Sequence, residues 1–179
     1  MNKNILVTGG FGILGRDLIK KLVKNKNHNV FLLDRSSNKK KISTLNIKSK
    51  NLKIIKGDFR IYKSLNLLIK KKNINTIFHL GAITQVIDAY KSPVETYECN
   101  ITGTINILEA MRNNNKNINL IYSSSDKAYG ELRNKEYLEN HPLKGDYPYD
   151  VSKSASDLIA QSYAKTYNLR VGIIRSGNI

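Results

Sequence analysis

The sequence has few of the residues that crosslink or stiffen a chain: its 179 residues include one cysteine, three prolines and no tryptophan. The single cysteine, Cys99, excludes an internal disulfide, suits a reducing compartment and is expected in the core. No apolar run approaches the roughly 20 residues of a membrane-spanning helix. The N-terminal stretch MNKNILVTGG has too short an apolar part for a signal peptide. These absences favour a single cytoplasmic domain without a membrane partner.

Acidic residues are also scarce, 14 against 30 basic residues, which gives a net charge of +16. Such a charge can indicate a nucleic-acid partner, but no motif that interleaves basic and aromatic residues supports one. The lysines stand singly or in short runs, of which Lys39–Lys41 falls in a predicted loop and Lys70–Lys72 at a helix end, where cations suit the dipole. We interpret them as solvated surface, which would also attract an anionic nucleotide substrate.

The apolar residues alternate between two periodicities. Six short runs are typical of buried strands: Ile5–Val7, Val30–Leu33, Lys53–Ile55, Thr76–Leu80, Leu120–Tyr122 and Val171–Ile174. Four stripes at helical spacing lie between them: Ile13, Leu14, Leu18, Leu22 and Val23; Leu65, Leu67, Leu68 and Ile69; Ile101, Ile105, Leu108 and Met111; Ala155, Leu158, Ile159, Ser162 and Tyr163. This alternation predicts an α/β fold, a doubly wound parallel sheet (Rossmann fold) of about six strands with helices on both faces.

A glycine-rich stretch, TGGFGILG at 8–15, joins the first predicted strand to the first predicted helix. Gly9, Gly12 and Gly15 let the backbone turn sharply and approach a pyrophosphate, which the helix N-terminus would bind through its N–H groups. Ile13 and Leu14 would begin that helix beside the cofactor. The alternative is a plain strand–helix turn.

An acidic residue at the end of the second predicted strand is the next sign of a dinucleotide site. Asp34 could accept hydrogen bonds from the adenosine ribose and repel a 2′-phosphate, which favours NAD over NADP. Arg35 beside it could instead hold that phosphate. Asp58, after the third strand, could read the adenine amino group or cap a helix.

A tyrosine stands four residues before a lysine in PYDVSKS, at 148–154. On a helix this spacing places Tyr149 and Lys153 on one face. Alone the pair could be accidental, and Ser123–Ser125 upstream could be a polar turn.

Together these stretches resemble the extended short-chain dehydrogenases/reductases, specifically the NAD-dependent nucleotide-sugar epimerases and dehydratases. The matching segments cover the whole chain in order: TGGFGILG, GDFR, FHLGA (where the family has HLAA), CNITGTINILEA, YSSSDKAYG and Tyr149-x-x-x-Lys153. SSSDKAYG, PYDVSKS and RSGNI are most similar to CDP-glucose 4,6-dehydratases, which carry Ser-Asp-Lys where dTDP-glucose and GDP-mannose dehydratases carry Thr-Asp-Glu.

The resemblance implies oxidation of the sugar at C4 by NAD, with Tyr149 as the base for the C4 hydroxyl. Lys153 would lower the pKa of Tyr149 and bind the nicotinamide ribose, and Ser125 would hydrogen-bond the C4 oxygen. Asp126, held protonated, would donate to the departing C6 hydroxyl. Lys127 stands where the family has a glutamate base and would orient Asp126 or water, or act as base when neutral. A surface ion pair between Asp126 and Lys127 is the alternative.

The resemblance also implies further binding residues. His79 would line the cofactor's pyrophosphate and ribose edge, and Asn100 would support the site or be a buried, satisfied amide. Three histidines without metal spacing predict no metal site. The remaining cofactor candidates are Phe59, Leu80, Gly81, Ala82, Thr84, Asn100 and Tyr149, and the substrate candidates are Thr84, Ser125 and Asn178.

Family members are much longer than 179 residues, so residues 1–179 are expected to be the NAD-binding domain, truncated before a C-terminal substrate-binding domain. Three functions stay open: a nucleotide-sugar 4,6-dehydratase, a 4-epimerase of the same family, and a non-catalytic NAD-binding module. The expected partners are a nucleotide-diphosphate sugar and, in the full-length form, a second copy in a homodimer. The sequence does not identify the nucleotide or the sugar.

Overall fold

The computed structural model describes residues 3–36, 38–114, 117–131 and 136–177. Its six strands form one parallel sheet in the order β3-β2-β1-β4-β5-β6. Their bounds are β1 Lys3–Thr8, β2 His28–Asp34, β3 Leu52–Lys56, β4 Thr76–His79, β5 Asn119–Ser123 and β6 Arg170–Ile174. All six predicted strands are therefore confirmed, with Leu80 one residue beyond β4. The strand order reverses between β1 and β4, and an open parallel sheet binds ligands at such a point.

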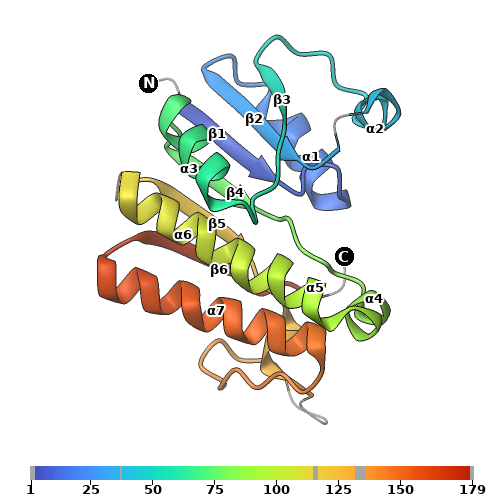
Figure 1. Cartoon of the computed structure of the whole chain (residues 1–179), viewed down its shortest axis with the longest axis vertical. Coiled ribbons are helices and arrows are strands. Elements are labelled where there is room, and N and C mark those ends of the chain that lie inside the picture. The colour runs from blue at the N-terminus through green and yellow to red at the C-terminus, as the bar shows by residue number, and fades with distance from the viewer. Residues whose placement is uncertain (1–2, 37, 115–116, 132–135, 178–179) are drawn as a thin grey trace.

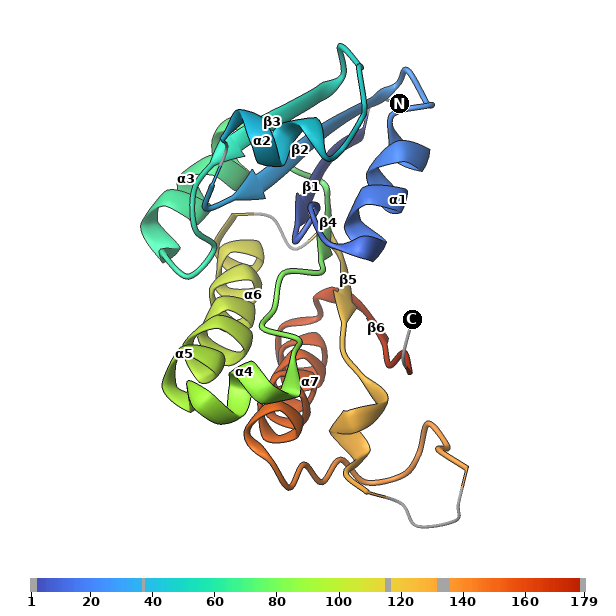
Figure 2. The same ribbon diagram turned by 90° about the vertical axis from the view of Figure 1, so that its right-hand side faces the viewer.

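The helices cover both faces of the sheet (Figures 1 and 2). Their bounds are α1 Ile13–Leu22, α2 Lys39–Ser43, α3 Tyr62–Lys71, α4 Val86–Lys91, α5 Pro93–Tyr97, α6 Gly103–Asn114 and α7 Pro148–Tyr167. A π-helical turn, η1 (Glu98–Thr102), joins α5 to α6, and a 3₁₀ turn, η2 (Asp126–Tyr129), follows β5. Lys70 and Lys71 lie in the last turn of α3, as predicted.

Successive strand residues pack on opposite faces of the sheet and so build two cores. Leu6, Phe31 and Ile77 pack with side chains of α3, α6 and α7. Val7 and Leu32 pack on the other face with Ile19 of α1. Cys99 is buried, as predicted. Helices on both faces of a parallel sheet confirm the doubly wound fold.

Three of the predicted helix stripes, those of α1, α3 and α7, are partly wrong, and in α3 Leu67 is 50% exposed. Ile13 and Leu14 are 68% and 42% exposed because α1 starts at the open edge of the sheet, and Ile19 makes the buried contact instead. In α7, Leu158 is 52% exposed. The buried side of α7 carries mainly small polar and charged residues whose hydrogen bonds are made inside the protein: Ser152, Lys153, Ser154, Ser156 and Asp157.

The predicted loop at 39–41 is also wrong, since these residues begin the short helix α2. Asn38 caps this helix, with its side-chain oxygen accepting from the Lys41 N–H at 2.8 Å. Among the described residues, no helix is long and apolar enough to cross a membrane.

Candidate functional site

The glycine loop turns between β1 and α1 in a space too tight for side chains. Gly9 has a φ of 69°, and a Cβ there would lie 2.6 Å from the carbonyl carbon of Leu80. A Cβ on Gly15 would lie 2.3 Å from the Gly9 oxygen. A Cβ on Gly12 would meet only the Gly9 oxygen, at 3.3 Å, and would otherwise point into open space. The turn therefore requires that Gly9 and Gly15 carry no side chain, whereas Gly12 has open space beside its Cα.

Two hollows adjoin at this loop and share Gly9, Gly12, Leu80 and Thr84. The first, about 370 Å³, runs toward the ends of β2 and β3 and is further lined by Phe11, Asp34, Arg35, Lys41, Asp58, Phe59, Arg60, Gly81, Ala82 and Cys99, among others. The second, about 490 Å³, runs toward α7 and is further lined by Ile13, Leu14, Gly15, Ser123, Ser124, Ser125, Lys127, Tyr149, Lys153, Ser176 and Gly177, among others. The two form an elongated groove along the carboxyl ends of the strands.

Asp34 lies in the first hollow as predicted, but its partner was not foreseen. Its Oδ1 accepts from the Ser36 N–H at 2.9 Å and from Lys41 Nζ at 2.7 Å. The expectation that Lys41 is solvated surface is wrong, because the turn of α2 places its ammonium against the carboxylate of Asp34. Arg35 lines the same hollow but pairs with Glu95 at 3.6 Å.

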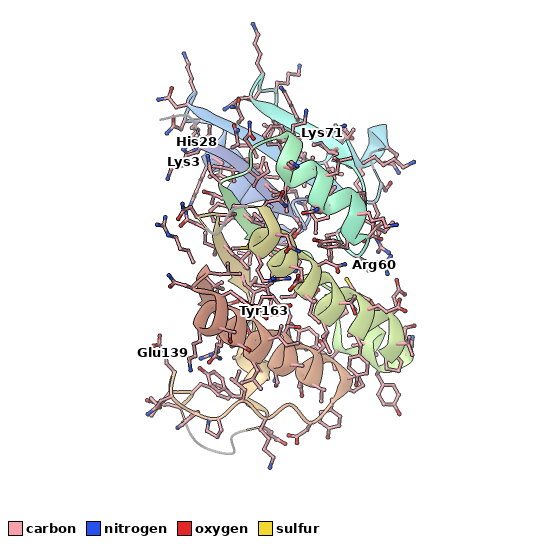
Figure 3. The ribbon with its side chains drawn as sticks, turned by 60° about the vertical axis from the view of Figure 1, so that its left-hand side comes forward. Lys3, His28, Arg60, Lys71, Glu139 and Tyr163 are labelled. Atoms are coloured by element: carbon pink, nitrogen blue, oxygen red, sulfur yellow. The ribbon has the colours of Figure 1, made fainter. Side chains whose placement is uncertain are left out.

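Asp58 also lines the first hollow, and it does not cap α3. The N-cap position of α3 is Ile61, so the helix-cap alternative is wrong. The Asp58 carboxylate instead accepts from the Arg60 backbone N–H at 2.9 Å and from its guanidinium at 2.7 Å. Burial raises the pKa of Asp58, but the hydrogen bonds from Arg60 outweigh it and lower the pKa overall. Figure 3 labels Arg60 where the chain enters α3.

A buried row of hydrogen bonds runs behind the groove from β4 to η1. The Gly81 N–H donates to Thr8 Oγ1 (3.1 Å), which bonds His79 Nδ1 (2.7 Å), and His79 Nε2 bonds Thr104 Oγ1 (3.2 Å). The hydroxyl of Thr104 donates to the Asn100 carbonyl (2.6 Å), so His79 must donate from Nε2 and accept at Nδ1. Burial lowers the pKa of His79 to about 3, which keeps it neutral.

His79 and Asn100 support the groove rather than line it. His79 is buried in this row, so the prediction that it lines the cofactor's edge is wrong. The Asn100 amide bonds the Ile83 backbone at both its N–H (2.8 Å) and its carbonyl (3.0 Å), and it donates to Ser152 Oγ (2.9 Å). Asn100 is thus the buried, satisfied amide of the alternative interpretation and does not contact the hollows.

Tyr149 and Lys153 both line the second hollow from the first turns of α7, so the structure brings the predicted pair together. Lys153 Nζ donates to the Ser123 carbonyl at 2.9 Å and lies 5.5 Å from the centre of the Tyr122 ring. Burial lowers the pKa of Lys153 to about 8.

The pKa of Tyr149 moves against the sequence-based expectation. Burial raises it, a hydrogen bond with Ser125 lowers it, and the charges of Asp126 and Asp150 raise it further. The protein groups alone therefore raise the pKa of this phenol, because burial outweighs the hydrogen bond with Ser125.

Ser125 is placed at the centre of the predicted catalytic group. It lines the second hollow together with Tyr149, donates to Asp126 Oδ1 at 3.0 Å and accepts from the Lys127 N–H at 3.2 Å. Asp126 lines a neighbouring hollow with Tyr129, Tyr137, Glu139, Ile173 and Arg175, and its Oδ2 would lie 3.5 Å from a Cβ on Gly177 of the second hollow. Among the ion pairs of the described residues, none joins Asp126 to Lys127, so the surface-pair alternative is wrong.

Arg175 was missed by the sequence analysis and ties three elements together beside the site. From the end of β6 its guanidinium donates to both carboxylate oxygens of Asp157 in α7, at 2.8 and 3.0 Å. It also donates to the Tyr129 hydroxyl of η2 at 2.8 Å and to the Glu139 carbonyl at 3.2 Å. Figure 3 labels Glu139 in the loop between η2 and α7. Arg175 thus fixes the turn that carries Ser125. The predicted substrate residue Asn178 lies outside the described residues.

Comparisons with known proteins agree with this geometry. Residues 6–179 match the model of the GDP-mannose 4,6 dehydratase family. The chain is 32% identical over 191 residues to dTDP-D-glucose 4,6-dehydratase of Dictyostelium discoideum, covering 99% of this chain and 44% of the relative. It is 28% identical to the structure of dTDP-glucose 4,6-dehydratase from Bacillus anthracis in complex with NAD, with a TM-score of 0.83 over 97% of this chain and 54% of that one.

The names of the relatives do not agree on one reaction. A structure of UDP-N-acetylglucosamine 4-epimerase from Methanobrevibacter ruminantium, in complex with UDP-N-acetylmuramic acid, is 30% identical. It gives a TM-score of 0.85 over 97% of this chain and 54% of that one. The chain spans about half the length of the curated relatives it matches. The similarity therefore covers both reaction types.

Proposed function

The chain belongs to the GDP-mannose 4,6-dehydratase family, whose relatives are NAD-dependent nucleotide-sugar dehydratases and epimerases. We propose that it is part of a nucleotide-sugar 4,6-dehydratase. The observation that carries the proposal is the meeting of Ser125, Tyr149 and Lys153 in a hollow that adjoins the glycine loop. Asp126, one hydrogen bond from Ser125, favours dehydration over plain epimerisation. The CDP-glucose branch, a cytoplasmic location and a homodimer stay predictions.

The family's cofactor is NAD, as predicted, and the described residues fit it. The loop at Gly9 and Gly12 and the start of α1 would hold the pyrophosphate, because they offer backbone N–H groups and no obstructing side chain. Asp34 would bind the adenosine ribose and Lys153 the nicotinamide ribose. When bound there, NAD would supply the hydride chemistry of the reaction, as acceptor for C4 of the sugar and donor for C6.

The chain's own residues handle the protons. Tyr149 accepts the proton of the C4 hydroxyl, and Ser125 hydrogen-bonds the same oxygen, which is consistent with both side chains lining one hollow. Asp126 then protonates the C6 hydroxyl, which leaves as water. The C5 proton is removed in the same elimination. Lys127 lines the hollow; in its neutral form it would accept the C5 proton, and as an ammonium it would orient Asp126 or a water molecule.

A 4-epimerase is the second candidate, and one observation favours it. Asp126 lines a hollow separate from that of Tyr149 and Lys153. Epimerisation at C4 needs oxidation and re-reduction only, without an acid at C6. Similarity to a 4-epimerase supports it as well.

We also propose that residues 1–179 form the cofactor-binding domain of the whole protein, with the substrate's nucleotide bound by a further domain. The share of the relatives that the chain covers, about half, supports this division. A non-catalytic NAD-binding module is the remaining candidate.

The reaction is tested by incubating the native polypeptide that carries this chain with NAD⁺ and hexoses activated with CDP, dTDP, GDP or UDP, deuterated at C4. We expect a 4-keto-6-deoxy product with deuterium at C6, identified by NMR and mass spectrometry. A C4 epimer with deuterium at C4 would show the epimerase instead. Binding of NAD with neither product from any of the sugars would leave the non-catalytic module.

Gly12→Ala should weaken NAD binding at least about tenfold. The free energy of unfolding should change by less than about 1 kcal/mol, so the thermal unfolding midpoint should change little. The added methyl enters open space at the groove and has no close neighbour except the Gly9 oxygen. Titration calorimetry and thermal melts measure the two effects.

Gly172→Ala is the matched control, because a Cβ on this β6 residue would meet only the Leu120 oxygen, at 3.9 Å, and Gly172 lines neither hollow. Equal NAD affinity of the two variants would contradict the placement of the pyrophosphate.

A further inference from the structure

The side chain of Lys41 contacts the carboxylate of Asp34, which is expected to hydrogen-bond the adenosine ribose. Its Nζ lies 2.7 Å from Asp34 Oδ1 and 4.9 Å from the centre of the Phe11 ring, and all three residues line the first hollow. The cap from Asn38 starts α2 and so brings Lys41 back toward the end of β2. The Lys41 side chain is 38% exposed, so its ammonium can meet a ligand as well as Asp34.

The other cations of this hollow have different carboxylate partners. Arg60 pairs with Asp58 at 2.7 Å and lies 3.8 Å from Glu95, and Arg35 lies 3.6 Å from the same Glu95. Among the ion pairs of the described residues, Lys41 is the cation that pairs with Asp34. Lys41, rather than the neighbouring Arg35, therefore controls the charge at this carboxylate.

A lone carboxylate at this position repels a 2′-phosphate, and that repulsion is what selects NAD over NADP. An ammonium 2.7 Å from the carboxylate cancels its charge, and the same ammonium attracts a phosphate. A dinucleotide with a 2′-phosphate would thus meet an ion pair instead of a lone negative charge.

We propose that Lys41 is a specificity-determining residue that narrows the preference for NAD over NADP. The inference rests on the proposed NAD site. The wild-type protein should bind NADP within about tenfold of its NAD affinity, and Lys41→Met should raise the NADP-to-NAD ratio of dissociation constants by about tenfold or more. The loss should fall on NADP, because Met removes the phosphate's partner and leaves Asp34 charged.

The experiment measures the dissociation constants of NAD and NADP by titration calorimetry at one fixed salt concentration for the native polypeptide and its variants. Lys20→Met is the matched control, since it removes the same charge from an exposed pair with Asp17 on α1, outside both hollows. Lys41→Arg keeps the cation and should retain the wild-type ratio. Asp34→Asn/Lys41→Met should bind NADP about tenfold more weakly than Asp34→Asn, because the ammonium also acts on the phosphate directly.

The outcomes separate this inference from the proposed function. A wild-type protein that binds neither dinucleotide would overturn the NAD site itself. The protein could instead bind NAD while Lys41→Met and Lys20→Met give NADP-to-NAD ratios of dissociation constants within twofold of each other. That result would overturn only the role of Lys41. Melting curves establish that each variant is folded, and Lys41→Gln repeats the measurement with a neutral polar side chain.

Discussion

Tyr149→Phe should lower kcat for the proposed nucleotide sugar by about 10²- to 10⁴-fold, the usual contribution of a general base, with NAD binding nearly unchanged. The hydroxyl removed belongs to a side chain that lines the second hollow with Ser125, whereas the ring that fills the space stays. Steady-state kinetics of the native polypeptide and a titration with NAD measure the two effects separately.

The same variant should also change the pH profile. Because burial raises the pKa of Tyr149, its phenolate is scarce at neutral pH, and wild-type turnover should increase as the pH rises. Tyr149→Phe should lose this increase. Tyr147→Phe is the control, since Tyr147 is largely exposed two residues earlier and makes no side-chain cap. If both variants kept wild-type kcat, Tyr149 would not be the base.

Arg175→Ala should destabilise the fold by about 3–5 kcal/mol, the usual cost of removing one partner of a buried ion pair. Asp157 is fully buried and would lose two hydrogen bonds from the guanidinium, and Tyr129 and the Glu139 carbonyl would each lose one. Urea unfolding at neutral pH measures the change. Arg112→Ala, which removes a partly exposed pair with Glu109, should destabilise the fold far less.

The pH dependence of this destabilisation should identify the buried Asp157 carboxylate as its cause. Burial raises the pKa of Asp157, but hydrogen bonds, first of all from Arg175, outweigh it and lower the pKa overall. A lowered folded-state pKa gives stability that is present above the unfolded value, near 3.9, and is lost as the pH falls through the folded value.

Without Arg175, the Asp157 carboxyl keeps the hydrogen bond from Gln161 but loses its largest pKa-lowering contact, so burial should raise its pKa and the folded variant should prefer the protonated form. The destabilisation by Arg175→Ala should therefore be largest near neutral pH and shrink as the pH falls through the raised folded-state pKa of the variant toward about pH 4 and below. A difference that stays constant between these pH values would show that lost packing, and not the uncompensated carboxylate, causes the effect.

The parts of the fold that the sequence predicted correctly depend on local signals. The buried runs such as Ile5–Val7 are apolar because both faces of the sheet are covered. The glycine loop and the four-residue spacing of Tyr149 and Lys153 each lie within one turn, so their geometry follows from neighbouring residues. Helix α7 misled the periodicity rule, since Ser152 and Ser156 are buried through hydrogen bonds to backbone carbonyls and Leu158 is exposed.

The residues that the sequence analysis missed act through partners elsewhere in the chain. Lys41 meets Asp34 across a loop, and Arg175 meets Asp157 from a different element. His79 is fixed by Thr8 and Thr104, far away in sequence on either side. A composition rule assigns such cations to the surface, because their partners are defined only when the chain has folded.

The π-helical turn η1 makes the length of this segment as important as its composition. The turn holds one residue more than an α-helix would use for the same advance, and Asn100 lies within it. Deleting a single residue between Glu98 and Thr102 would restore a regular helix and rotate Asn100 by about 100° relative to α6. The amide would then leave Ile83 and Ser152. A one-residue deletion would thus break the hydrogen bonds by which Asn100 joins Ile83 of the cofactor groove to Ser152 of the helix that carries Tyr149, whereas a substitution on the outer side of the turn would leave them in place.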